Sequence, residues 1–212
     1  MRRRPTAPVP SAGTARRGCP RWAGNVVMLL AGACFIPMWY FLSLYMQGEL
    51  HYGALATGAG FLPHTLVGIA AARLAPAVMQ HTGPRTLIMG SALLSAAGFV
   101  WQSRIETGSG YLEGLLGPAV VMSAGMGLLI TPITTTVTSG IPEQDAGAAS
   151  GLMNATRQIG GALGLAALVT LTATTAGTAA SYRAVFLTIA AVCTGVAALA
   201  LTLPAPHGQD ER

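Results

Sequence analysis

Lysine is absent from this chain, and charged residues of every kind make up only 9% of its 212 residues. Soluble domains carry about 25% charged residues, which they need to keep their surface hydrated. Hydrophobic residues, in contrast, account for 52% of the chain. This balance excludes an ordinary water-soluble domain and favours a protein whose surface faces lipid.

Cysteine is also scarce, with three residues at Cys19, Cys34 and Cys193. Their number is odd and their spacing is irregular, which is typical neither of a disulfide framework nor of a zinc site. We therefore expect no metal site, and we interpret the cysteines as small packing residues.

Long apolar stretches fill most of the chain. They cover residues 25–46, 56–79, 86–102, 112–138, 146–171 and 182–203. A helix needs about 20 residues to cross a hydrocarbon layer of about 30 Å, and a helix satisfies its own backbone hydrogen bonds in lipid. The sequence therefore predicts an all-α membrane protein with six transmembrane helices within 22–203. Residues 1–21 are predicted to be a disordered basic segment, and 204–212 a short tail.

All twelve basic residues are arginine, and six of them precede the first apolar stretch. Six crossings with a cytoplasmic N-terminus place eight arginines inside and two, Arg104 and Arg183, outside. This distribution follows the positive-inside rule. We expect a multi-pass protein of the plasma membrane with both termini cytoplasmic. We therefore attribute the positive charge of the arginines to membrane topology and to contact with the lipid bilayer, and we expect no nucleic-acid partner.

The fifth stretch carries a polar face. Small and polar residues recur at steps of three and four, which places them on one side of a helix: Gly147, Ser150, Asn154, Arg157, Gly161 and Gly164. Asp145 is predicted to be the N-cap of this helix. Glycines allow a neighbouring helix to approach closely, and we expect this role for five of them, namely Gly147, Gly151, Gly160, Gly161 and Gly164.

Ionisable side chains inside a membrane are costly and often functional. Counted from the start of its helix, Arg157 lies about 10 to 16 Å into the hydrocarbon layer. It either lines a substrate path or anchors helix packing through backbone carbonyls. His64 is a candidate for proton coupling because its pKa starts near neutrality, with a packed neutral histidine as the alternative. Glu113 is expected at the solvated edge.

The fourth stretch contains Pro132 followed by several threonines. A proline frees a backbone carbonyl, and threonine hydroxyls help to satisfy such groups. Pro132 is therefore a candidate for a bend that lines a path, and tight packing is the alternative explanation of this region.

The run from Ile141 to Gly164 resembles the penultimate-helix signature of the fourteen-helix drug:proton antiporters of the major facilitator superfamily. Residues 39–47, 57–63 and 82–85 resemble the ninth helix, the tenth helix and the cytoplasmic turn that follows. Pro76 and His81 depart from the family pattern at that turn. The resemblance covers about 22–203.

The resemblance implies that the chain is the C-terminal six-helix half of such a carrier. That half consists of two three-helix inverted repeats, here 22–105 and 111–203, and substrate binds between the two halves of the carrier. Asn154, Arg157 and Gln158 match the family signature. The implied function is export of hydrophobic or cationic compounds driven by a proton gradient, without a cofactor, in company with a separate N-terminal half or a second copy.

The sequence leaves two other functions to consider beside export. Residues 148–151 partly match a serine-protease nucleophile motif around Ser150, but no histidine lies in the last stretch to act as its base, so we expect no enzyme. An independent six-helix protein, acting as a homodimer or as a non-transporting partner, remains the alternative.

Overall fold

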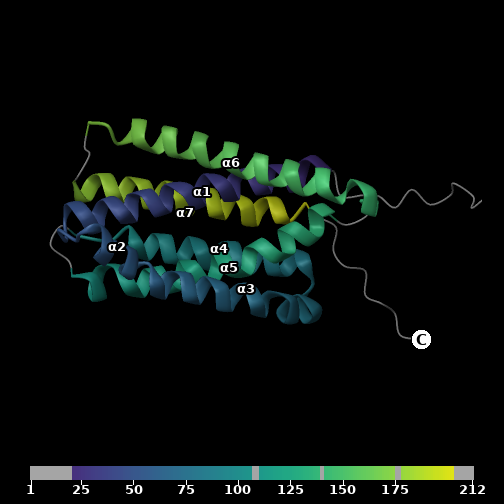
Figure 1. Cartoon of the computed structure of the whole chain (residues 1–212), viewed down its shortest axis with the longest axis horizontal. Helices are drawn as coiled ribbons and strands as arrows, with labels where there is room; N and C mark the ends of the chain where they lie inside the picture. The colour runs from purple at the N-terminus through teal and green to yellow at the C-terminus, as the bar shows by residue number, and fades with distance from the viewer. Residues whose placement is uncertain (1–20, 107–109, 139–140, 175–177, 203–212) are drawn as a thin grey trace, which may run out of the picture.

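A computed structural model describes residues 21–106, 110–138, 141–174 and 178–202, and every regular element in this part of the chain is a helix. Six long helices run back and forth along one axis (Figure 1). They are α1 (Arg21–Gly48), α3 (Leu62–Thr82), α4 (Pro84–Gln102), α5 (Gly117–Thr138), α6 (Ala146–Leu171) and α7 (Ala179–Ala200). Three short segments join them, namely α2 (Ala54–Gly60), the π-helical η1 (Tyr111–Leu116) and the 3-10 turn η2 (Glu143–Asp145).

The helices coincide with the six predicted apolar stretches. Four segments are long and apolar enough to cross a membrane: Gly24–Gly48, Ala54–Thr82, Gly114–Thr136 and Ala179–Ala200. Helices α4 and α6 fall outside that measure, and both carry polar residues. Three polar side chains of α4 are buried and do not meet lipid, since Ser91, Ser95 and Gln102 are at most 2% exposed. The structure therefore confirms six long helices, and four candidate spans by length and composition. That all six helices cross the membrane stays a prediction.

Proline and glycine set two of the breaks. Phe61 ends α2, and Pro63 stands in the first turn of α3, where its missing N–H costs nothing. The predicted stretch 56–79 is thus two helices rather than one. Gly83 adopts φ 78°, a left-handed conformation that glycine tolerates, and Pro84 begins α4 directly after it.

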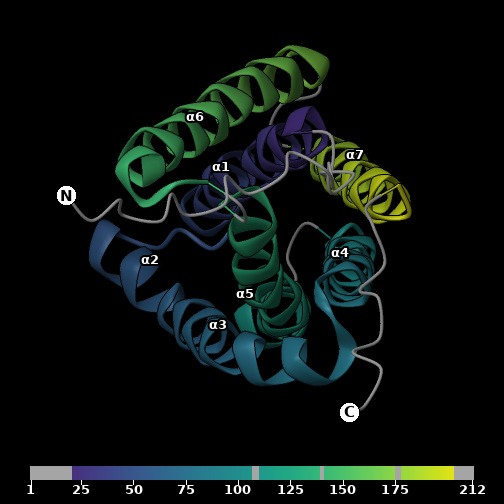
Figure 2. The same cartoon turned by 90° about the vertical axis from the view of Figure 1, so that its right-hand side faces the viewer.

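The helix pairings follow a regular scheme (Figure 2). Helix α6 packs mainly on α1, and α3 packs mainly on α5; both lie at the outside of the bundle. Helix α7 contacts α1 and α4, and α4 contacts α5. The described chain begins and ends at the same end of the bundle.

The core lies between α1, α4, α5 and α7. Its largest fully buried side chains include Tyr45, Phe99 and Phe186, and the rings of Phe99 and Phe186 stack with centroids 6.4 Å apart. Cys34 and Cys193 lie in this core as free thiols, with sulfur atoms 3.6 Å apart.

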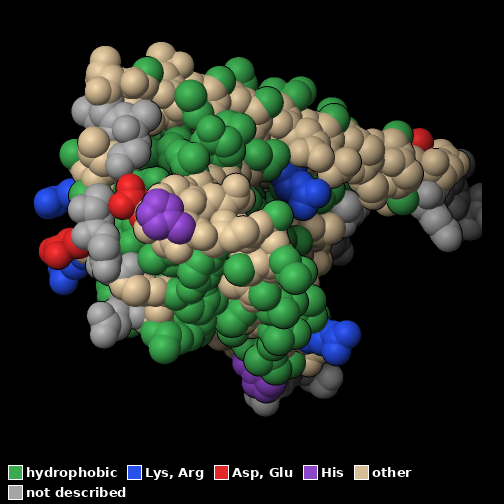
Figure 3. Space-filling view, turned by 60° about the vertical axis from the view of Figure 1, so that its left-hand side comes forward, with side chains coloured by type: hydrophobic (Ala, Val, Ile, Leu, Met, Phe, Trp, Pro, Cys, Tyr) green, Lys and Arg blue, Asp and Glu red, His purple; other side chains and the backbone are tan. Residues whose placement is uncertain are grey.

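The outer helices expose large apolar side chains. On α3, Leu66 is 64% exposed, and on α6 Leu152 and Leu163 are 59% and 60% exposed. Hydrophobic side chains and uncharged groups dominate the face in Figure 3, on which charged side chains are few. A soluble monomer rarely exposes apolar area on this scale, whereas a membrane protein presents it to lipid or to another helical segment.

Candidate functional site

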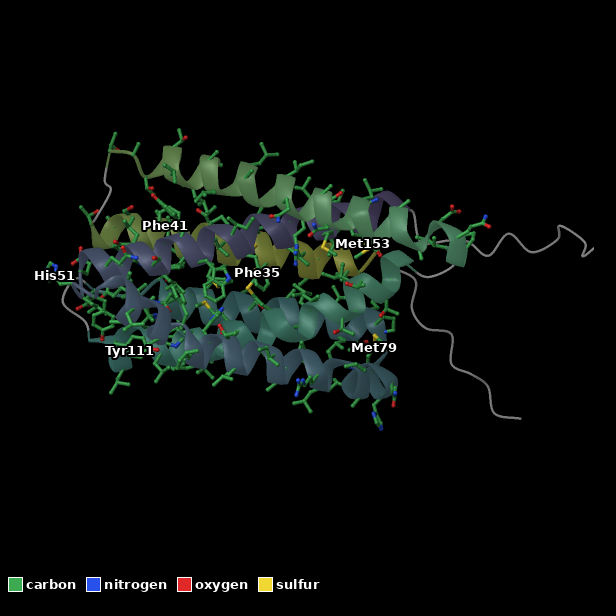
Figure 4. The ribbon with its side chains drawn as sticks, in the orientation of Figure 1. Phe35, Phe41, His51, Met79, Tyr111 and Met153 are labelled. Atoms are coloured by element: carbon green, nitrogen blue, oxygen red, sulfur yellow. The ribbon has the colours of Figure 1, made fainter. Side chains whose placement is uncertain are left out.

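A cavity of about 220 Å³ lies between α1, α5 and α6. Helices α1 and α5 provide its apolar wall, which consists of Met28, Ala31, Phe35, Leu129, Ile130 and Ile133, with Thr134 beside them. Helix α6 provides Met153 and the polar rim of Ser150, Asn154 and Arg157. Figure 4 shows Phe35 nearer the middle of the bundle and Met153 nearer the end where the described chain begins.

Arg157 and Asn154 form a pair at the rim. A guanidinium N–H of Arg157, on Nη2, donates to Asn154 Oδ1 over 3.0 Å. They are three residues apart on α6, so the helix itself places one side chain beside the other. Both residues are exposed in this chain, and no carboxylate is among the described residues that line the cavity.

The backbone of α6 at Arg157 is held tightly against α1. A Cβ atom added to Gly32 would overlap the carbonyl oxygen of Arg157, and one added to Gly160 would overlap the carbonyl oxygen of Leu29. Gly164 lies against Ala33, and Gly161 against Ile36. Close approach of this kind between small residues is a common way to pack helices in membranes.

The residues of the predicted polar face of α6 thus fall into two groups and a remainder without close contacts. Gly160, Gly161 and Gly164 lie against α1, while Ser150, Asn154 and Arg157 line the cavity. Gly147 and Gly151 have open space where a Cβ would stand, so they make no close contact with described residues of this chain. Gln158 is exposed and does not line the cavity. Asp145 occupies the N-cap position as predicted, but its side chain makes no capping hydrogen bond.

His64 belongs to a different cluster. It is 6% exposed, its Nδ1 is hydrogen-bonded to the hydroxyl of Ser123 on α5, and its ring meets Trp39 of α1 edge-on at 4.7 Å. The Ser123 hydroxyl also contacts the carbonyl oxygen of Ala119. The cluster therefore joins α1, α3 and α5, and His64 lies apart from the Arg157 cavity.

Pro132 is buried in α5 beside the cavity but does not line it. Thr136 Oγ1 donates to Pro132 O over 2.7 Å, and Thr135 Oγ1 donates to Thr131 O over 3.0 Å. These hydroxyls bind carbonyls one turn before them. The carbonyl that Pro132 frees belongs to residue 128, one turn earlier still, so neither of these bonds compensates it as the sequence suggested.

Two residues of these clusters, Gly32 and Ser123, did not stand out in the sequence. Gly32 and Ser123 are partners of Arg157 and His64, but each lies in an ordinary stretch of small and apolar residues. Their only signal is a small residue within a long apolar run, which does not reveal the helix that it meets.

A comparison with protein families identifies the superfamily of this chain. The family model described as Major Facilitator Superfamily matches residues 2–165. The chain belongs to the major facilitator superfamily. Membership makes it a multi-pass membrane protein of a superfamily of transporters, which are not enzymes, and this agrees with the resemblance found in the sequence.

Relatives within the superfamily are exporters and resistance proteins of bacteria. The chain is 50% identical over 188 residues to the cephamycin export protein CmcT of Amycolatopsis lactamdurans, an alignment that covers 86% of the chain and 39% of that protein. It is 37% identical over 150 residues to the puromycin resistance protein pur8 of Streptomyces alboniger, covering 69% and 29%. It is 31% identical over 165 residues to the tetracenomycin C resistance and export protein of Streptomyces glaucescens, covering 76% and 30%.

The chain therefore spans less than half the length of these relatives. It is a fragment-length member of the superfamily, similar to antibiotic and drug export proteins.

Proposed function

We propose that this chain forms one six-helix half of a proton-coupled exporter of small organic compounds, and that it acts together with a second half. The observation that carries the proposal is the 50% identity, over 86% of the chain, to a protein named for cephamycin export. The matched segment is 39% of that protein, which is the share that a six-helix half of a longer carrier would occupy.

The helix pairings support an internal repeat within this half. Exchanging α1 with α5, α3 with α6, and α4 with α7 turns the main pairings of the long helices into one another and leaves the α4–α7 pairing unchanged. The α1–α6 contact becomes α5–α3, and α1–α7 becomes α5–α4. Such a scheme is expected of two three-helix repeats, 22–105 and 111–203, related by a pseudo-two-fold axis.

The glycines agree with the repeat. Gly32 of α1 faces the Arg157 carbonyl of α6, and Gly127 of α5 faces the Gly68 carbonyl of α3. In both cases the first helix of one repeat packs on the second helix of the other through a glycine and a carbonyl.

The second half is expected to cover the side of the bundle on which α3 and α6 stand outermost and on which the Arg157 cavity lies. The exposed leucines of α3 and α6 and the open space at Gly147 and Gly151 suit close contact with another set of helices. Substrate would then bind between the two halves, near the level of Arg157.

Energy coupling requires a group that gains and loses a proton during the cycle. His64 is our candidate because it is buried at a junction of three helices and bonded to Ser123. A change in its protonation would alter a contact between α3 and α5, which are the helices expected to border the substrate path. The proton gradient supplies the energy, and no cofactor is involved.

Efflux from proteoliposomes tests the proposal. Vesicles would contain the chain alone, or the chain together with the part of the Amycolatopsis relative that lies outside the matched segment. Cationic, uncharged and anionic dyes would be loaded and a pH gradient imposed. We expect gradient-driven efflux only when both parts are present.

The alternative function is that of an independent homodimer or non-transporting partner. Gradient-driven efflux by the chain alone, in vesicles where cross-linking detects two copies, would support the homodimer. Absence of efflux with the second part, although that part binds the chain, would support the non-transporting partner.

A further inference from the structure

The cavity between α1, α5 and α6 is apolar on one side and polar on the other. Its wall from α1 and α5 is apolar apart from Thr134, and its α6 rim carries Ser150, Asn154 and Arg157. A volume of about 220 Å³ equals that of about seven water molecules, enough for the ring system of a small organic compound. Sites for such compounds typically combine an apolar surface with a few polar groups that fix orientation.

The polar rim is rich in hydrogen-bond donors. Arg157 uses one N–H group on Asn154, and the guanidinium has five in all. Because Asn154 Oδ1 accepts that bond, the amide nitrogen of Asn154 is the part of the side chain left to meet a ligand. Ser150 adds a hydroxyl. Donors grouped in this way suit a ligand whose oxygens only accept.

The charge of the rim points the same way. Arg157 is the sole charged residue among the described residues that line the cavity. Asp145, a described carboxylate at the N-cap of α6, lies twelve residues earlier, or about 18 Å along the helix. Electrostatic interactions are strong away from water, so an anionic ligand would stabilise the Arg157 guanidinium at this depth. A cationic ligand would be repelled by it.

The backbone under Arg157 is fixed in advance. The close contacts of Gly32 with the Arg157 carbonyl and of Gly160 with the Leu29 carbonyl hold α6 on α1. The guanidinium therefore projects from a rigid support, and its bond to Asn154 further limits its rotation. A planar guanidinium held in this way binds a carboxylate through two parallel hydrogen bonds.

We propose that this cavity binds an amphiphilic organic anion, with the acidic group on Arg157 and Asn154 and the apolar body against Met28, Phe35 and Leu129. The inference rests on the proposed transport function, and it narrows the substrate class from small organic compounds to hydrophobic anions, in place of the hydrophobic or cationic compounds that the resemblance implied.

Three probes of similar size test the proposal: 1-naphthoate, its methyl ester and 1-naphthylmethylammonium. Equilibrium dialysis would measure their binding to the chain in nanodiscs of uncharged phosphatidylcholine, which removes attraction by the lipid surface. We expect naphthoate to bind at least about ten-fold more tightly than the ammonium probe, as an added charge-assisted bond would produce.

Variants locate the effect. Arg157→Gln should weaken naphthoate binding about ten-fold or more and leave the ester unchanged, whereas Arg157→Lys should retain most of the preference for the anion. Phe35→Ala should weaken all three probes alike. Arg73→Gln is the matched control, because Arg73 is an exposed arginine of α3 outside the cavity lining. Circular dichroism would verify that each variant folds.

Equal binding of the three probes, no binding by the wild-type chain, or an unchanged naphthoate affinity in Arg157→Gln would overturn the proposal. A further contrary result is that adding the second part abolishes naphthoate binding and that neutralising one carboxylate of that part restores it. Arg157 would then form an ion pair with that carboxylate rather than bind a ligand. Binding is measured without a pH gradient, so failure here leaves the transport function, which efflux tests, intact.

Discussion

Gly32 on α1 lies directly against the backbone carbonyl of Arg157 on α6, so that even one additional carbon atom at Gly32 would overlap it. This contact links the packing of two helices to the position of the charged group in the cavity. Helix α6 otherwise has few neighbours within the described chain, since it packs mainly on α1. Its orientation therefore depends on a short row of glycine contacts.

The first prediction concerns that row. Gly32→Ala should destabilise the chain by about 1 to 3 kcal/mol, as expected when a side chain is forced into a filled space. The measurement is the midpoint of unfolding in mixed detergent micelles as the SDS fraction rises. Gly195→Ala is the matched control, because nothing lies within 4 Å of a Cβ at that glycine of α7. Equal midpoints for both variants would show that the α1–α6 contact is not as close as described.

The second prediction concerns Tyr111, which links η1 to the end of α2. Its hydroxyl donates to Gly60 O over 2.6 Å, and burial together with the nearby Tyr52 raises the pKa of Tyr111, so the phenol keeps its proton at neutral pH. Tyr111→Phe should cost about 1 kcal/mol of stability. Tyr40→Phe is the control, since Tyr40 is 44% exposed on α1. If both variants unfold at the same SDS fraction, the hydrogen bond contributes nothing measurable.

The third prediction separates two roles of His64. Asparagine can hydrogen-bond Ser123 from nearly the position of the histidine Nδ1, but it does not take up a proton at physiological pH. If His64 couples transport to protons, His64→Asn should abolish gradient-driven efflux by the two-part carrier while dye exchange down its own gradient continues. Ser123→Ala, which removes the bond and keeps the histidine, should retain coupling at a reduced rate. Full gradient-driven efflux in His64→Asn would assign the residue to packing alone.

The sequence was sufficient to locate the helices. Long apolar runs favour helices in lipid, and a long helix is observed in each of the six stretches. It also placed Asn154 and Arg157 on one face, because a three-residue step fixes neighbours within a helix. The sequence did not predict where one helix ends and the next begins. The stretch 56–79 is divided at Phe61, which the sequence does not reveal because Pro63 can either start a helix or bend one.

Contacts between helices were beyond the reach of periodicity. The sequence placed Gly147 and Gly164 on one helical face, yet Gly164 lies against α1 and Gly147 has open space. The difference arises because α1 crosses only part of α6. Likewise, nothing in the order of residues indicates that His64 meets Ser123, 59 positions later. Such pairings depend on how the helices cross.

The fourth prediction concerns orientation. Both ends of the described chain lie at one end of the bundle, and the arginine distribution predicts that this end is cytoplasmic. In a background with Cys19→Ser, Cys34→Ala and Cys193→Ala, a membrane-impermeant maleimide added to intact cells should label His51→Cys but not Thr202→Cys. Both should react after the cells are opened. The reverse pattern in intact cells would invert the topology.

The most direct test of the central claim is pH-gradient-driven dye efflux from proteoliposomes that hold the chain alone or the chain with the complementary part of the Amycolatopsis relative. We predict no efflux from the first and clear efflux from the second, lost again in Arg157→Ala. Efflux by the chain alone, diminished by Arg157→Ala, would contradict the claim that it is one half of a two-part carrier.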